Sequence, residues 1–167
     1  MFRPCYFTTN FNIHFNKFIK MKTIEITLYE FNELSEPAKK VAINEFCDIN
    51  IGYDWWSNVY EDANNIQLKL TSFNDRYWPE IEFLQSPIDT ANEIILNHGE
   101  HCDTYQHATH FLIGVYNESD FIRNLKAEYR IMLREEYDYL ISDEVIIESI
   151  ECNEYLFTDK GKFYPYE

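Results

Sequence analysis

Residues 119–140 read SDFIRNLKAEYRIMLREEYDYL, and this stretch decides the fold class more than any other. Its apolar residues recur every three or four positions, which is the period of an amphipathic helix. The stripe that we expect to face the core consists of Ile122, Leu125, Tyr129, Met132 and Leu133. Ser119 is the expected N-cap, because a serine hydroxyl can accept a bond from a backbone N–H of the first turn. The stretch therefore predicts one long helix late in the chain.

The same spacing predicts five shorter helices, over residues 35–48, 53–66, 88–98 and 104–116 and from Ser142 onward. Ser35 and Ser142 are expected N-caps, and Pro37 suits a first turn because proline has no N–H to lose there. Asp103 is the expected N-cap of the fourth of these helices. Gly99 falls at the C′ position of the third, where we expect a left-handed conformation.

The helix predicted over residues 53–66 carries an aromatic stripe. Its members are Trp56, Val59, Tyr60 and Ala63. Trp55 lies one position off this stripe, at its edge. Aromatic residues at helical spacing usually bury apolar surface, so we expect a core face here and not a cofactor site.

Alternating apolar and polar residues predict three strands, at residues 23–30, 67–73 and 80–84. The last two are expected to form a hairpin, and residues 155–165 a second hairpin that turns at Lys160–Gly161. The resulting order is β-α-α-β-β-α-α-α-α-β. It predicts an α+β fold in which a small antiparallel sheet packs with about five to six helices. At 167 residues the chain fits a single domain, expected over residues 21–167.

The composition excludes several classes of protein. The four glycines each stand alone, whereas a glycine-rich phosphate loop needs several close together. The four cysteines form no C-x-x-C pair, so no zinc ribbon or thioredoxin motif is indicated, and free thiols in a reducing cytosol are expected. The sequence contains no run of about 18 apolar residues, so no membrane span is predicted.

Residues 1–20 differ from the rest of the chain. They place phenylalanine at positions 2, 7, 11, 15 and 18 among Asn and Thr, and they lack the compact apolar core of a signal peptide. Met21 precedes KTIEITLYEF, which reads as a natural protein start. We interpret residues 1–20 as an added or poorly anchored N-terminal extension. The alternative is an arm whose aromatic side chains pack on the body.

The charge is strongly acidic and unevenly distributed. The chain has 14 basic and 29 acidic residues, yet residues 1–22 contain four basic residues and no acidic one. The remaining 145 residues therefore carry 10 basic and 29 acidic residues, a net charge of −19. Nucleic-acid phosphates repel such a body, and a basic protein partner attracts it. The alternative is that the charge serves only solubility.

Four blocks of sequence occur in an order that resembles a known family. They are YEFNELSEPAKKVAINEF, YDWWSNVYEDANNIQLKLTSFN, NHGEHCDTYQHATHFL and EYRIMLREEYDYLISDEVIIESIECNEYLFTDKGKFY. Together they resemble small proteins of bacterial phages and mobile elements that are often labelled as antitoxins of toxin–antitoxin stability systems. The resemblance covers residues 22–163 and excludes residues 1–20.

The resemblance implies a cytoplasmic protein of a bacterial host cell, with no catalytic residue to transfer and no cofactor. The favoured function is inhibition of a host nucleic-acid-handling defence system of anti-CRISPR type, by an acidic surface that imitates nucleic-acid phosphates. The expected partner is a host protein with a basic surface, such as a CRISPR effector or another nuclease. No direct contact with nucleic acid or membrane is expected. One alternative is an antitoxin that neutralises a toxin enzyme.

The carboxylates that we predict to contact a partner lie near the carboxyl-terminal end. Glu144, Glu148 and Glu151 are spaced i, i+4, i+7, so they share one face of a helix. Upstream of them lie Glu135, Glu136 and Asp138. The alternative is a solvated outer face without a partner.

A histidine-rich stretch, NHGEHCDTYQHATHFL at residues 97–112, suggests a metal site. His107 and His110 are i, i+3 and could bridge a zinc ion, and His98 and Cys102 could complete it, or His101 in their place. Such a site would make a third function possible, a metal-dependent hydrolase. The resemblance argues against it, because related proteins often have Lys or another polar residue at the positions of His107 and His110.

The favoured interpretation of this stretch is a junction between two helices, with no metal. His98 is then expected to meet the last carbonyls of the helix before it. Cys102 is expected to be a small buried thiol.

Overall fold

The computed structural model describes residues 25–71 and 80–165. It contains a short 3-10 helix η1 (Phe31–Glu33), α1 (Glu36–Glu45), α2 (Ser57–Asn65), β1 (Leu68–Leu70), β2 (Ile81–Phe83), α3 (Pro87–Asn97), α4 (Asp103–Leu112), α5 (Glu118–Leu140) and α6 (Asp143–Cys152). β1 and β2 form a two-stranded antiparallel sheet in which Lys69 lies opposite Glu82. The predicted class, an α+β domain with six helices and a small antiparallel sheet, is confirmed.

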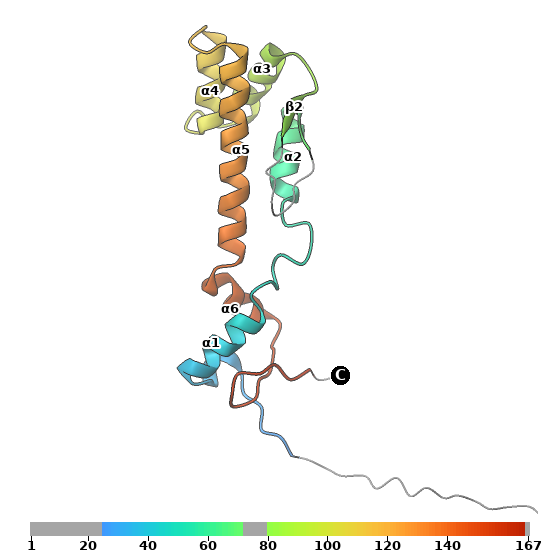
Figure 1. Ribbon diagram of the computed structural model, residues 1–167, viewed down its shortest axis with the longest axis vertical. Coiled ribbons are helices and arrows are strands. Elements are labelled where there is room, and N and C mark those ends of the chain that lie inside the picture. The colour runs from blue at the N-terminus through green and yellow to red at the C-terminus, as the bar shows by residue number, and fades with distance from the viewer. Residues whose placement is uncertain (1–24, 72–79, 166–167) are drawn as a thin grey trace, which may run out of the picture.

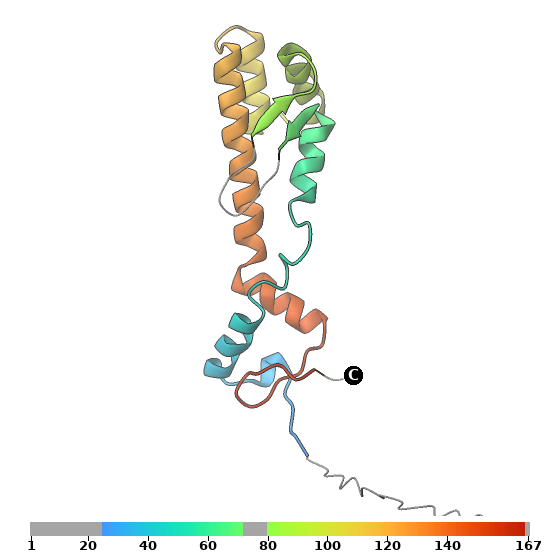
Figure 2. The same ribbon diagram turned by 45° about the vertical axis from the view of Figure 1, so that its right-hand side comes forward.

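The molecule is elongated, and α5 forms most of its length (Figure 1). The sheet, α2, α3 and α4 lie beside the first part of α5, at the upper end of the view. Helices α1 and α6 lie at the lower end with the closing segment of the chain, and the turned view shows the same division (Figure 2). Each end has its own cluster of buried hydrophobic residues.

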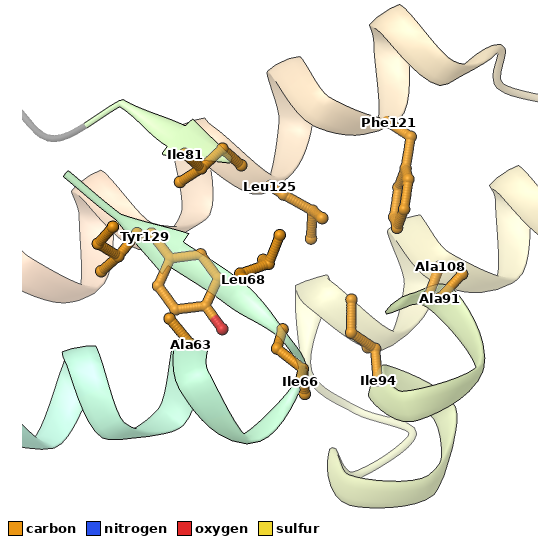
Figure 3. Close-up of a cluster of buried hydrophobic side chains, with 11 residues drawn as sticks. Ala63, Ile66, Leu68, Ile81, Ala91, Ile94, Ala108, Phe121, Leu125 and Tyr129 are labelled. Carbon is orange, nitrogen blue, oxygen red and sulfur yellow. The ribbon is translucent and has the colours of Figure 1, made fainter. Parts of the chain in front are cut away.

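The upper cluster lies between α5, the sheet and the helices beside it (Figure 3). Leu125 and Tyr129 of the predicted stripe are fully buried there, and Ile122 and Met132 pack against the cluster while partly exposed. Leu133 is also fully buried. The stripe of the long helix is therefore confirmed. Phe121, which the sequence analysis did not include, is fully buried and stacks on Phe111 with ring centroids 4.5 Å apart.

The lower cluster combines aliphatic side chains with a group of aromatic rings. Phe46 stacks on Tyr155 at 4.9 Å and meets the edges of Phe163 at 5.3 Å and Phe157 at 6.0 Å. Such pairs add about 0.5–1.5 kcal/mol each beyond the burial of their area. These rings come from the end of α1 and from the closing segment, so they join regions more than 100 residues apart in the sequence.

The closing segment turns at the predicted position, but its two arms pair in the single bridge Phe157–Phe163 and form no strand among the described residues. The Thr158 N–H donates to the Lys162 carbonyl at 2.9 Å, and the Gly161 N–H donates to the Thr158 carbonyl at 2.9 Å. Gly161 has φ +75°, and a Cβ added there would come within 3.0 Å of three backbone atoms of Ala38. Only glycine permits both the left-handed turn and this close approach to α1.

The strand predicted at residues 23–30 is wrong over the residues that the structure describes. Only Tyr29 pairs, in a single bridge to Phe157, and Phe157 also bridges Phe163. Residues 23 and 24 lie outside the described residues, as does the predicted extension 1–20. Alternation alone does not make a strand here. Ile26 stays exposed and Leu28 is only half-buried, so the apolar face of the segment is not covered by the rest of the described fold.

Several helix ends differ from those predicted. The helix expected over residues 35–48 ends at Glu45, that expected over residues 53–66 begins at Ser57, and that expected over residues 104–116 ends at Leu112. Gly114, at φ +79°, explains the last difference, because its left-handed conformation turns the chain from α4 into α5.

The helix caps also required correction. The N-cap of α5 is Asn117 and not Ser119, and its side chain accepts from the Asp120 N–H at 2.9 Å. The N-cap of α4 is Cys102, so Asp103 is the first helical residue. Gly99 follows the C-cap His98 but does not have a positive φ.

Ser35 and Ser142 occupy N-cap positions as predicted, although neither side chain accepts a backbone bond there. Ser142 instead donates through Oγ to the Tyr139 carbonyl at 2.7 Å. Asn50 links the same region: its side chain donates to the Leu140 carbonyl at 3.2 Å and accepts from Ser149 Oγ at 2.7 Å. These bonds tie the end of α5 to α6 and to the segment that follows α1.

The structure buries Trp55 more deeply than Trp56, the opposite of what the predicted stripe implies. Trp55 is 6% exposed, whereas Trp56, placed on the stripe, is half-buried. Trp55 precedes α2, so helical spacing does not govern its direction, and its ring lies 5.4 Å from that of Tyr137 on α5. The remaining stripe residues face the upper cluster as predicted.

Of the helices within residues 25–71 and 80–165, none combines the length and apolar character needed to cross a membrane.

Candidate functional site

The predicted carboxylates at the end of α5 border a shallow hollow between α5 and α2. Glu135 and Glu136 line it with Asp62 of α2, over a volume of about 380 Å³. Its apolar part comes from Val59 and Met132. Asp62, which the sequence analysis did not single out, thus adds a third carboxylate to this face.

Asp62 is held in place by a chain of polar contacts that runs into the upper cluster. Tyr129 donates through its hydroxyl to Asp62 Oδ2 at 2.8 Å, and His98 Nε2 lies 3.5 Å from Asp62 Oδ1. His98 Nδ1 lies 2.7 Å from Thr104 Oγ1. These contacts link four residues in the order Tyr129, Asp62, His98 and Thr104, and they connect α5 with α2 and with the α3–α4 junction.

The tyrosine at the inner end of this chain strongly favours its protonated form. Burial raises the pKa of Tyr129 far above its ordinary value of 10.0, and the charge of Asp62 and the hydrogen bond to it raise it further. Removing the proton would place a second negative charge beside Asp62 in an apolar environment. Tyr129 is therefore a fixed hydrogen-bond donor at neutral pH.

The order hydroxyl, imidazole, carboxylate is the order of a nucleophilic triad, but access to it is restricted. Thr104 is 1% exposed and Tyr129 is fully buried. A substrate cannot reach either hydroxyl in this conformation, whereas a nucleophile must contact the reacting atom. Only Asp62 opens onto the hollow, with 40% of its side chain exposed. These polar contacts therefore serve to orient one surface carboxylate, that of Asp62.

The carboxylates of α6 form an exposed row. Glu144, Glu148 and Glu151 are all exposed, while Ile146 and Ile150 on the other face are buried in the lower cluster. The spacing i, i+4, i+7 places the three side chains on one face of the helix. Asp138 differs, because Arg134 lies 3.8 Å away on the same helix and offsets part of its charge.

Most basic residues of the described chain are already paired with carboxylates. Lysine or arginine nitrogens lie within 4.0 Å of carboxylate oxygens in the pairs Lys39–Glu36, Lys69–Glu82, Arg123–Asp120, Lys126–Glu80, Arg130–Glu80, Arg134–Asp138 and Lys162–Glu45. Lys126 and Arg130 lower the pKa of the exposed Glu80, chiefly through the Lys126 hydrogen bond. Among the residues described, none of these basic groups pairs with Glu135, Glu136 or the α6 row.

The histidine-rich stretch separates into different surroundings. His98 contacts Asp62 and Thr104, whereas His107 Nε2 lies 3.2 Å from Glu128 Oε1 and His110 packs edge-on against Tyr116. Across the described residues, no three or more His, Cys, Asp or Glu side chains gather in a way that could hold a metal ion.

Two expectations for this stretch were wrong. Cys102, at the N-cap of α4, is an exposed free thiol, and Cys47 and Cys152 are exposed free thiols as well. His98 does not meet the last carbonyls of α3: its ring nitrogens face Thr104 and Asp62 instead. The stretch is nevertheless a junction between two helices, as interpreted.

Sequence reasoning missed Asp62, Thr104 and Tyr129 as members of one polar chain. Tyr129 was placed on the buried stripe, and a buried tyrosine hydroxyl needs a hydrogen-bond partner. That need was the available signal. It did not identify Asp62, which lies 67 positions away in sequence.

Comparison with protein-family models, with characterised proteins and with solved structures gives no match.

Proposed function

We propose that this chain is a phage or mobile-element protein that binds and inhibits a host nucleic-acid-handling defence protein, of the anti-CRISPR type. Its carboxylates would occupy a basic surface that otherwise holds nucleic acid. The observation that carries the proposal is the exposed α6 row, together with Glu135 and Glu136, for which the described residues provide no basic partner.

Unpaired carboxylates suit a charged partner better than paired ones. A carboxylate in an ion pair must lose that pair before it can bind elsewhere, whereas a solvated carboxylate has only its hydration to exchange. The repulsion within the row costs only a few tenths of a kcal/mol per pair. A basic partner would relieve this repulsion and would be attracted over distances of about 8–10 Å at physiological salt.

The charge density of the row supports imitation of a single nucleic-acid strand. Glu144 and Glu151 are seven residues apart, which is about 10 Å of helix axis, so three charges are spaced on average about 5 Å apart. One DNA strand carries about one charge per 3.4 Å. The row is thus less dense than a strand but comparable with it.

The proposal is tested by reversing the row. The full chain is used to capture proteins from a lysate of the bacterial host, and captured nucleases or CRISPR effectors are then assayed for inhibition. We expect Glu144→Lys, Glu148→Lys and Glu151→Lys together to abolish capture and inhibition, because three attractive charges become repulsive. Capture should also weaken steeply as salt is raised.

A matched control reverses three other exposed carboxylates, Asp48→Lys, Asp54→Lys and Glu61→Lys, which changes the net charge equally. The control should retain inhibition, and both variants should show the circular dichroism of the folded chain. Unchanged binding by the folded α6 variant would refute the role of the row. Capture of a toxin enzyme without any defence protein would overturn the proposal in favour of an antitoxin.

A further inference from the structure

The hollow between α2 and α5 combines apolar surface with carboxylates. Val59 and Met132 line it and are only half-buried, so part of each apolar side chain is open to solvent. The carboxylates are those of Asp62, which has 40% of its side chain exposed, Glu135 and Glu136. At about 380 Å³ the hollow lies near the small end of the roughly 300–1,000 Å³ typical of ligand pockets. A small occupant, such as one long side chain, can therefore contact both kinds of surface.

The carboxylates stand on both walls of the hollow. On α2, Asp62 follows Val59 by three positions, so the two share a helix face. On α5, Glu135 follows Met132 by three positions and shares a face with it in the same way. Among the described residues that line the hollow, none is basic. A positive group that enters the hollow therefore meets apolar surface and negative charge from each helix.

Asp62 is held in place before any ligand binds. The Tyr129 hydroxyl donates to its Oδ2 at 2.8 Å, and His98 Nε2 lies 3.5 Å from its Oδ1. A carboxylate has about four lone-pair sites, so these two contacts leave acceptor sites of Asp62 for a ligand. Because the side chain is already ordered in the fold, less conformational freedom is lost when a ligand binds to it.

Arginine is the side chain whose chemistry matches this lining. Its guanidinium is planar, always charged and presents five N–H donors in a fork that pairs with carboxylates through two parallel bonds. Its aliphatic stem packs on apolar surface while the charged head reaches outward. Lysine has a similar stem, but its ammonium is a compact, strongly hydrated charge without the planar fork.

We propose that the hollow between α2 and α5 receives one arginine side chain of the basic partner protein. The stem lies against Val59 and Met132, and the guanidinium pairs with Asp62 and Glu135. This inference rests on the proposed function for the existence of a basic partner, and it adds the contact that positions that partner. The exposed α6 row attracts a basic surface from a distance, whereas one side chain seated in a hollow fixes the register of the two proteins.

The test replaces the partner with a small probe, N-acetyl-L-arginine amide, which carries the arginine side chain on an uncharged backbone. The probe is titrated into the isotopically labelled full chain, and NMR follows the chemical shifts of the backbone amides. We expect saturable shifts concentrated in residues 58–62 and 132–136, with a dissociation constant in the millimolar range, because a single side chain makes few contacts. N-acetyl-L-citrulline amide has nearly the same shape without the charge and should give no saturable shift. N-acetyl-L-lysine amide should bind several-fold more weakly than the arginine probe.

Two variants of equal charge locate the probe. Glu135→Gln removes a carboxylate of the hollow and should weaken binding of the arginine probe about tenfold, the loss of one charge-assisted pair. Glu148→Gln removes an exposed carboxylate of the α6 row, outside the lining of the hollow, and should leave binding unchanged. Both variants should keep the parent's amide spectrum away from the substituted residue, which shows that they are folded.

Three results would overturn the proposal. Equal weakening by the two variants would mean that the probe responds only to net charge. Equal binding of the citrulline probe would remove the role of the charge, and equal binding of the lysine probe would remove the preference for arginine. Because the titration contains no partner, its outcome is separate from that of the capture experiment. Capture that depends on the α6 row, without binding of the arginine probe, would exclude the arginine site and leave the proposed function standing.

Discussion

Gly161 and Gly114 both have left-handed backbones, but only Gly161 is in contact with the rest of the fold. Their φ angles are +75° and +79°, so replacement by alanine imposes a similar backbone cost on each, about 1–2 kcal/mol. A Cβ at Gly114 meets nothing within 4 Å, whereas a Cβ at Gly161 overlaps the backbone of Ala38 on α1. Overpacking of this kind adds about 1–3 kcal/mol. We therefore expect losses of about 1–2 kcal/mol for Gly114→Ala and about 2–5 kcal/mol for Gly161→Ala.

The measurement is urea unfolding followed by far-UV circular dichroism, with both variants and the parent chain fitted to a single transition. Because the backbone cost is common to both glycines, the difference between the variants isolates the contact between the closing hairpin and α1. Equal losses, within about 0.3 kcal/mol, would refute the reasoning that this hairpin is clamped against α1 at Gly161.

Two further predictions concern α5. Tyr129→Phe should weaken the loss of stability at alkaline pH. The raised pKa of Tyr129 keeps its hydroxyl protonated in the folded chain, so above pH 10 only the unfolded chain releases this proton. The free energy of unfolding of the parent chain therefore falls by up to about 1.4 kcal/mol per pH unit. Unfolding at pH 9 to 11 checks this, with Tyr53→Phe, at an exposed tyrosine, as the control; parallel pH curves for Tyr129→Phe and the parent would contradict it. Asn117→Ala should lower the free energy of unfolding by about 1 kcal/mol and Ser119→Ala by less than about 0.5 kcal/mol, because Asn117 is the residue that caps α5. Thermal unfolding measures both losses, and a larger loss for Ser119→Ala would show that Ser119 is the cap.

Local periodicity determined much of this protein. The buried stripe of α5, the β1–β2 hairpin and the exposed row of α6 were all predictable, since each depends on residues within one or two turns or across a short connection. The row in particular needs only the helix itself, because a spacing of four and three residues places carboxylates on one face wherever the helix lies. The turn at Gly161 was also predictable from its residue type.

Only the tertiary structure decided which distant residues meet. Asp62 and Tyr129 form a hydrogen bond although they lie 67 positions apart in the sequence, and Phe46 stacks on Tyr155, which lies 109 positions further along the chain. The same holds for Trp55, whose buried ring lies 5.4 Å from that of Tyr137, and for Glu151, which lines the same hollow as Glu30. Helical spacing fixes the direction of a side chain relative to its own helix, but the neighbour that it meets depends on how the helices pack. The sequence therefore determined where the acidic row lies on α6, and packing determined which hollows its neighbours border.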